Sequence, residues 1–140
     1  GIYGFCFYHY WFSGKILMKK PMEMFLENKE YKQHFCISWA NETWSRRWNG
    51  SEQDILIQQD HGDEKEWREH FYYLLPFFKD NRYILDKGKP LFILYKPEIF
   101  PGYLEMFELW NNLAIKEGFP GMSFAIQSAI WNSNTLQLCG

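Results

Sequence analysis

The stretch FCISWANETWSRRW, residues 35–48, joins a short apolar segment to a run of tryptophans and polar side chains. Residues 34–39 have the nearly continuous apolar character of a parallel strand that is covered on both faces. Asn41 and Glu42 follow directly, within the tryptophan run. A pyranose ring presents apolar C–H faces to aromatic side chains and hydroxyl edges to polar ones, so this strand end is typical of a sugar-binding surface. A surface loop whose tryptophans pack onto the core is the alternative interpretation.

The same pattern recurs along the chain. Three other segments are short, apolar and bounded by turn-forming residues, and we expect them to be buried strands: residues 2–8, 91–95 and 122–127. A further short strand is expected at residues 55–59. Pro21 suits the first turn of a helix, and residues 63–78 and 103–117 repeat apolar side chains at helical spacing, with Leu104 on the expected buried face. This order of strands and helices predicts an α/β fold with right-handed crossovers.

Each expected strand changes character at its carboxyl end, where aromatic and polar residues replace the apolar run. In parallel α/β folds these ends lie on one face, and ligands bind there. The sequence therefore predicts one substrate-binding surface made from four strand ends. Its candidate residues are Tyr8, His9, Tyr10, Trp11, Trp39, Asn41, Trp44, Arg47, Tyr95 and Gln127. For His9, a half-buried structural role is the alternative.

Glu42 and Glu98 are the candidate catalytic carboxylates, because each follows an expected strand at this surface. Flanking tryptophans could desolvate Glu42 and favour its protonated form, which a general acid needs. Alternatively, each glutamate binds sugar hydroxyls, or Glu42 pairs with Arg46 or Arg47. Glycoside cleavage usually takes two carboxylates about 5–9 Å apart, a distance that a sequence does not give.

Composition argues against several other classes of function. The 140 residues have a net charge of −2 and no basic run longer than two residues, so we expect neither nucleic acid nor an anionic membrane as a partner. No apolar stretch reaches the roughly 20 residues of a membrane span. No glycine-rich phosphate fingerprint follows a strand, so an enzyme acting on sugar phosphates would have to clamp them with Arg46 and Arg47. Aromatic residues make up 21% of the chain, which suits a carbohydrate substrate.

The cysteines and histidines do not indicate a metal or a cofactor. The three cysteines lack the spacing of a zinc site, and Cys6 and Cys36 are interpreted as small apolar residues of buried strands. Cysteines used in this way favour a reducing compartment, with the cytoplasm as the expected location. His34, His61 and His70 share no ligand spacing. We therefore expect no metal site and no cofactor.

Four motifs together resemble a known family. They are GIYGFCFYHYWFSGK at residues 1–15, FCISWANETWSRRWNG at 35–50, ILIQQ at 55–59 and GKPLFILYKPE at 88–98. In this order they closely resemble the WbsX-type family of glycosyltransferase or lipopolysaccharide-biosynthesis proteins, which is related to the family-99 glycoside hydrolases (endo-α-mannosidase-like). The resemblance covers essentially the whole chain.

The resemblance implies a (β/α)8 barrel, of which the chain looks like an inner portion. It would be a single domain over residues 1–140, truncated at both ends, with about four βα units. In the related hydrolases the catalytic glutamates belong to an Asn-Glu-Trp motif near the end of the barrel. ANETW at residues 40–44 looks similar but follows an early strand. The resemblance therefore implies that ANETW lines the cleft and that the catalytic pair lies beyond residue 140.

The expected function is that of a carbohydrate-active enzyme, of which this chain lines the sugar-binding cleft. The resemblance implies action on glycosidic bonds of an oligosaccharide or polysaccharide, in bacterial surface-polysaccharide (O-antigen or lipopolysaccharide) metabolism. The reaction would be that of a glycoside hydrolase or of a glycosyltransferase. A non-catalytic glycan-binding module is the alternative.

Overall fold

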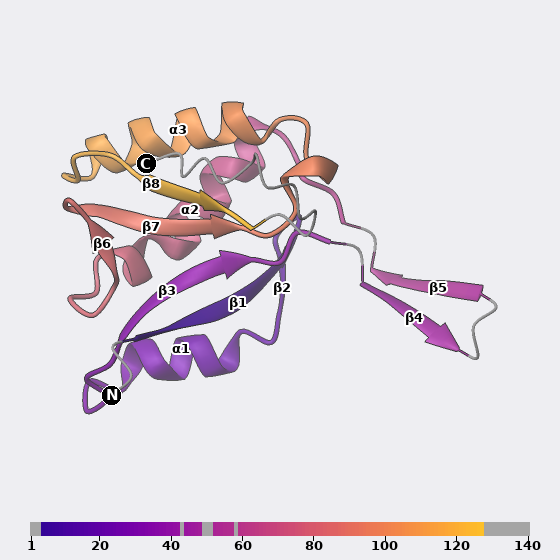
Figure 1. The fold of residues 1–140 in the computed structure, drawn as a ribbon, viewed down its shortest axis with the longest axis horizontal. Helices are drawn as coiled ribbons and strands as arrows, with labels where there is room; N and C mark the ends of the chain where they lie inside the picture. The colour runs from indigo at the N-terminus through magenta and orange to yellow at the C-terminus, as the bar shows by residue number, and fades with distance from the viewer. Residues whose placement is uncertain (1–3, 43, 49–51, 58, 128–140) are drawn as a thin grey trace, which may run out of the picture.

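The computed structural model describes residues 4–42, 44–48, 52–57 and 59–127, and of residues 44–48 and 52–57 only the backbone. Strands and helices alternate through these residues (Figure 1). The main elements are β1 (Gly4–Phe12), α1 (Lys20–Glu27), β3 (His34–Trp39), α2 (Glu64–Phe78), β7 (Lys89–Leu94), α3 (Tyr103–Lys116) and β8 (Ser123–Ile126). The alternation confirms the predicted α/β class.

The four main strands are parallel and lie in chain order, β1-β3-β7-β8. His9 pairs with Trp39, and Phe92 pairs with Phe124. The arrowheads of β3, β7 and β8 point to the same end of the sheet in Figure 1, and β1 is parallel to β3. The carboxyl ends of the four strands therefore form one edge, which we call the strand-end edge. No closed barrel forms among the described residues.

The helices α1, α2 and α3 all lie on the same face of the sheet. Side chains alternate along a strand, so residues in register on neighbouring strands point to the same side. Ring contacts with centroids 4.7–5.1 Å apart join Phe25 of α1 to Phe35, His70 of α2 to Trp39, and Trp110 of α3 to Phe92. Burying a large apolar side chain stabilises a fold by about 1.5–3 kcal/mol. This layer between helices and sheet is therefore what holds the described residues together.

Two tight hairpins that the sequence analysis did not predict flank the parallel strands. β2 (Lys15–Leu17) pairs with the end of β1, and β6 (Leu85–Asp86) pairs with the start of β7, both antiparallel. The connecting turns are Ser13-Gly14 and Lys87-Gly88, and φ is positive at both residues of each turn. Two-residue hairpin turns of type I′ need this conformation, which glycine adopts without strain.

Of the predicted strands, only the one at residues 34–39 has the predicted limits in the structure. Residues 55–57 of the strand expected at residues 55–59 form the second half of β5 (Glu52–Ile57), which makes an antiparallel hairpin with β4 (Trp44–Trp48). Residue 58 lies outside the described residues, as do residues 2 and 3 of the first expected strand. In Figure 1 the β4-β5 hairpin projects from the strand-end edge.

Two side chains are placed differently from the prediction. Leu104 is 63% exposed, because it lies about 120° around the helix axis from Trp110, which packs on the sheet. Cys6 is exposed, because it lies on the face of the sheet away from the helices and on the outer strand β1, where β2 does not reach it. Its neighbour in register, Cys36, is buried as predicted.

A buried arginine lies at the other end of the sheet, where β3 begins. Arg82, in the loop after α2, forms two hydrogen bonds of 2.9 and 3.1 Å with the carboxylate of Asp80. The same guanidinium donates to the backbone oxygens of Phe25, Asn28 and Tyr31 at 2.9–3.0 Å. These carbonyls lie at and just beyond the C-terminus of α1, where backbone acceptors have no partner within the helix. Arg82 therefore fixes α1 to the loop that follows α2.

Candidate functional site

A buried asparagine links two strands at the strand-end edge. Asn41, just after β3, is fully buried. Its Oδ1 accepts the backbone N–H of Lys96 at 2.7 Å, and its Nδ2 donates to the backbone oxygen of Lys96, also at 2.7 Å. Because a backbone N–H only donates and a backbone oxygen only accepts, these two bonds determine the orientation of the amide. Asn41, a predicted sugar-binding residue, thus holds the chain after β3 against the chain after β7.

Next to this link lies an ion pair between the two strand ends. The carboxylate of Glu42 is 2.9 Å from Nζ of Lys96, and both side chains are partly exposed, at 41% and 31%. The hydrogen bond that Lys96 donates to Glu42 raises the pKa of Lys96 above its usual value, and the charge of Glu98 adds to this rise. The edge therefore carries an ammonium group with carboxylates around it. Lys96 was missed by the sequence analysis, although it follows β7 just as Glu42 follows β3.

Three other predicted residues lie just past their strands. The backbone N–H of Tyr95 donates to the oxygen of Trp39 at 3.1 Å, and that of Gln127 donates to the oxygen of Leu94 at 2.9 Å. Glu98 is exposed in the short 3-10 turn η1 (Pro97–Ile99). The hydrogen bonds between the strands thus continue one residue beyond β7 and β8. They place Tyr95 and Gln127 at the same edge as Asn41.

The face of the sheet away from the helices carries two predicted tyrosines. Tyr8 and Tyr10 point to this face, and Tyr8 is 54% exposed. Ser38 lies beside Tyr8 in register and points the same way. Its hydroxyl is buried, and it has no hydrogen-bond partner among the described residues. This face therefore offers the exposed ring of Tyr8 next to the strand-end edge, with the Ser38 hydroxyl buried beside it.

Three predicted residues lie on the other side of the sheet, among the helices. His9, Trp11 and Trp39 are all buried there. Nε2 of His9 is 2.8 Å from Nε2 of His70, and Trp11 stacks on the His70 ring with centroids 4.4 Å apart. Burial lowers the pKa of His9 to about 3. Residues 8–11 alternate between the two faces, so their side chains do not form one surface, and we build the candidate site without these three.

The remaining predicted residues are not placed by the structure. The side chains of Trp44 and Arg47 lie outside the described residues, although the backbone of β4 is described. Their assignment to the sugar-binding surface stays a prediction.

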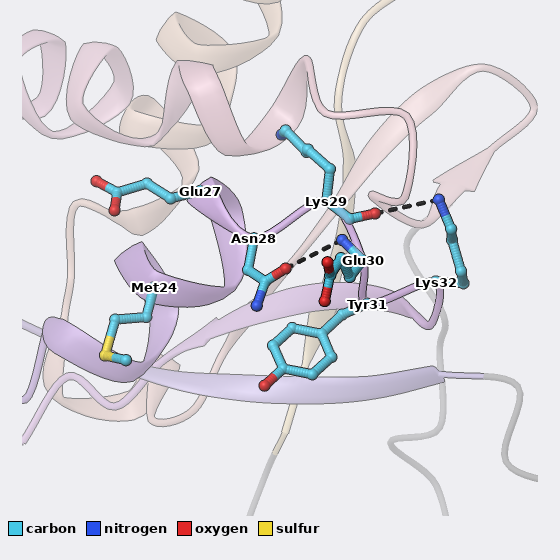
Figure 2. A pocket seen from close by; sticks show the side chains of 7 residues that line it. All are labelled: Met24, Glu27, Asn28, Lys29, Glu30, Tyr31 and Lys32. Carbon is cyan, nitrogen blue, oxygen red and sulfur yellow. Dashed lines mark hydrogen bonds between the residues drawn. The ribbon is translucent and has the colours of Figure 1, made fainter.

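A hollow lies at the other end of the sheet, away from the strand-end edge. It has a volume of about 920 Å³ and is lined by Met24, Glu27, Asn28, Lys29, Glu30, Tyr31 and Lys32 (Figure 2). Its polar groups already bond to one another: Oδ1 of Asn28 accepts the N–H of Glu30, and Lys32 donates to the oxygen of Lys29. Ligands of parallel α/β folds bind at the carboxyl ends of the strands, and this hollow lies at the amino ends. We therefore do not assign it to the candidate site.

No cluster of three or more His, Cys, Asp or Glu side chains in the described part of the chain is placed to hold a metal ion. No described helix combines the length and the apolar character that crossing a membrane requires.

Comparison with known proteins identifies relatives of the chain. It is 32% identical over 112 residues to "Uncharacterized protein WxcX" of Xanthomonas campestris pv. campestris strain B100, and equally to the protein of the same name in strain ATCC 33913. The alignment covers 80% of this chain and 16% of each relative, so the chain spans only a small part of these curated proteins. No solved structure matches the chain.

The family profile described as "Glycosyltransferase WbsX" matches residues 1–139. The match includes β1, β3 and β7, whose carboxyl ends meet at Asn41, Glu42 and Lys96. Together with the similarity to WxcX, this match over almost the whole length shows that the chain belongs to the glycosyltransferase WbsX family.

Proposed function

We propose that the chain forms the substrate-binding part of a carbohydrate-active enzyme that acts on glycosidic bonds of a bacterial surface polysaccharide. Membership of the WbsX family supports a role in glycan or polysaccharide biosynthesis. The structural observation that carries the proposal is the Glu42–Lys96 ion pair, which the buried Asn41 holds at the strand-end edge. Paired donors and acceptors of this kind suit sugar hydroxyls, which both donate and accept hydrogen bonds.

The same proposal assigns a binding role, and not a general-acid role, to Glu42. Its carboxylate lies 2.9 Å from Nζ of Lys96, which takes up one of its acceptor positions and leaves others for sugar hydroxyls. The catalytic carboxylate pair is proposed to lie outside these 140 residues, as the family resemblance implies. Substitution at the anomeric carbon would pass through an oxocarbenium-like transition state, with this chain positioning the sugar.

We also propose that the chain is part of a (β/α)8 barrel. In such a barrel the parallel strands follow one another in chain order, and the connecting helices all lie on one face of the sheet. The described strands and helices have this arrangement. A complete barrel takes about 250 residues. The face that carries Tyr8 and Ser38 would then point to the barrel interior.

The test uses Glu42→Gln in the full-length protein that contains these residues. Wild-type protein is expected to bind at least one member of an array of bacterial oligosaccharides. Because the amide is a weaker acceptor and loses the ion pair, the variant should bind the same oligosaccharide at least ten-fold more weakly. Surface plasmon resonance measures both affinities. Glu64→Gln is the matched control, since Glu64 pairs with Arg68 on the exposed side of α2.

Two outcomes would contradict the proposal. The wild-type protein could bind no array member, or Glu42→Gln could bind as tightly as Glu64→Gln does. A non-catalytic glycan-binding module is the second candidate, favoured by the continuous core that α1, α2, α3 and the sheet share. It predicts the same loss of binding without any turnover of the bound oligosaccharide.

A further inference from the structure

A second hollow opens beside the candidate site, on the helix side of the strand-end edge. It has a volume of about 460 Å³ and is lined by residues 59–62, Trp67 and residues 100–102. The first segment leads into α2 and the last leads into α3. We call it the side hollow. Pockets for small ligands have volumes of about 300–1,000 Å³, so it has room for a small molecule.

The aromatic wall of the side hollow is held in place by the protein itself. Phe100 stacks on His61 with ring centroids 4.5 Å apart and planes 10° from parallel. The indole N–H of Trp67 donates to the backbone oxygen of His61 at 2.8 Å. The backbone oxygen of Trp67 accepts the indole N–H of Trp110 at 2.9 Å. Because these rings are fixed before any ligand arrives, binding would cost little ordering of side chains.

The side hollow is connected to the candidate site through Asn41. Nδ2 of Asn41, whose orientation is determined by Lys96, also lies 3.2 Å from Nε2 of His61. Since Nδ2 can only donate, Nε2 of His61 accepts, and a neutral His61 carries its proton on Nδ1. Burial lowers the pKa of His61, against opposing effects of the Asn41 backbone and the Asp60 carboxylate. The ring is therefore oriented by the same amide that joins β3 to β7.

The charges around the side hollow disfavour an anionic ligand. Helix N-termini attract anions, and both α2 and α3 begin here. The start of α2 is already occupied, however, because Oδ1 of Asp63 accepts the N–H of Glu66 at 3.1 Å. The start of α3 has no side-chain cap, but its first turn carries the carboxylate of Glu105. Asp60 adds an exposed carboxylate to the lining. A neutral ligand with hydroxyl groups fits this combination better than a phosphate does.

We propose that the side hollow binds one neutral pyranose ring, as a sugar subsite additional to the strand-end edge. This inference rests on the proposed function. The apolar face of the sugar would lie against Trp67 and Pro101, and its hydroxyls would donate to the carboxylate of Asp60. A glycan that spans the subsite and the Glu42–Lys96 pair would be bound at two points. The subsite would then select for oligosaccharide length.

Gly102 offers a way to block the subsite without removing any of its walls. A Cβ built on Gly102 lies 3.5 Å from a ring carbon of Phe100 and 3.5 Å from one of Trp67, which is ordinary contact. Its φ of −89° is open to any residue. Gly102→Ala should therefore be tolerated and leave the hollow open, whereas Gly102→Leu should fill the space in front of the aromatic wall.

The experiment is saturation-transfer NMR on the full-length protein, with a panel of neutral methyl hexopyranosides as probes. At least one probe should receive saturation from the wild type and from Gly102→Ala, and should bind at least ten-fold more weakly to Gly102→Leu. Circular dichroism checks that each variant is folded. If Gly102→Leu does not fold, Asp60→Asn replaces it: the amide oxygen can still accept the Gly62 N–H, and binding should weaken several-fold.

The outcomes separate this inference from the proposed function. Equal probe binding by Gly102→Leu and Gly102→Ala would overturn the subsite, as would displacement of the probe by inorganic phosphate. If no hexopyranoside binds while Glu42→Gln still weakens oligosaccharide binding, the subsite is wrong and the proposed function stands. If neither the probes nor any oligosaccharide binds, both fail.

Discussion

At the scale of single residues, the contact between His9 and His70 restricts the protonation of both. The two Nε2 atoms are 2.8 Å apart, so one nitrogen carries the proton and the other accepts it. Trp11 and Tyr73 stack on these rings, and both histidines are fully buried. Burial lowers both pKa values, that of His9 to about 3. The folded protein therefore contains two neutral imidazoles where the unfolded chain would be protonated in mild acid.

This pair predicts that the protein loses stability in mild acid. An unfolded histidine has a pKa of about 6.5, so between about pH 6.5 and pH 3 the unfolded state binds more protons than the folded state. The free energy of unfolding should thus be highest above pH 6.5 and fall by roughly 2 kcal/mol between pH 7.5 and pH 5 through His9, and His70 should add a loss of the same sign. Urea denaturation at these two pH values measures the difference.

A double variant, His9→Phe with His70→Leu, is the control for this effect. It fills similar space with apolar groups, so its unfolding free energy should depend less on pH than that of the wild type. If the unfolding free energy of the variant changed with pH as much as that of the wild type, the histidine pair would not be the cause of the acid sensitivity.

At the scale of elements, α1 depends on a residue that lies far along the chain from it. Arg82 donates to the backbone oxygens of Phe25, Asn28 and Tyr31, and its guanidinium lies 4.3 Å above the Phe25 ring. Cations near a helix C-terminus interact favourably with its dipole. Arg82 also holds the pKa of Asp80 below its usual range, although burial acts in the opposite direction.

Arg82→Met should therefore destabilise the protein by about 3–5 kcal/mol, because it leaves the Asp80 carboxylate buried without its main partner. Urea denaturation measures the loss. The matched control is Arg68→Met, which removes an exposed pair with Glu64 and should cost about 0.5 kcal/mol. Similar values for the two variants would mean that the Arg82 cluster is not a main support of α1.

The elements also show what the sequence could and could not predict. Buried strands and amphipathic helices have strong periodic signals, and the four predicted buried strands and the three predicted helices are present. The hairpin strands β2 and β6 are two or three residues long, too short to show periodicity. Their signal was in the turns, Ser13-Gly14 and Lys87-Gly88. Residues 8–11 were predicted as one surface, but strand alternation puts His9 and Trp11 in the core.

At the scale of the whole molecule, parts of both outer strands have no pairing partner among the described residues. β1 pairs with β2 only over residues 10–12, and β8 pairs only with β7 in the described part of the chain. Phe5 and Tyr8 of β1 are 36% and 54% exposed. Strand edges with exposed aromatic residues tend to pair with other chains.

The 140-residue chain produced alone should therefore self-associate, whereas the full-length protein should not. Size-exclusion chromatography with light scattering at tens of micromolar protein measures the mass of each. A monomeric isolated chain with a cooperative thermal transition would contradict the barrel proposal and favour the glycan-binding module.

In the candidate site, some features follow from the local sequence and others depend on contacts between distant residues. The sequence located the strand-end edge, because each strand ends in polar or aromatic residues. It did not predict that Asn41 would bond to Lys96, which is 55 residues away. Nor did it indicate Trp67 or Phe100 as walls of a hollow, since both look like ordinary core positions of α2 and the turn before α3. Such pairings depend on tertiary packing.

The Asn41 link makes the site sensitive to a change of a single group. Deamidation, the slow hydrolysis that converts an asparagine amide to a carboxylate, would replace the Nδ2 donor with a charged oxygen. That oxygen would face the backbone oxygen of Lys96 at 2.7 Å and the lone pair of His61 at 3.2 Å. The contact with the Lys96 oxygen would become repulsive, and His61 would have to move its proton from Nδ1 to Nε2 to bond to the new oxygen. The amide that now joins β3, β7 and the loop before α2 would be lost. Chemical ageing at this one position would thus disable the strand-end edge and the side hollow together.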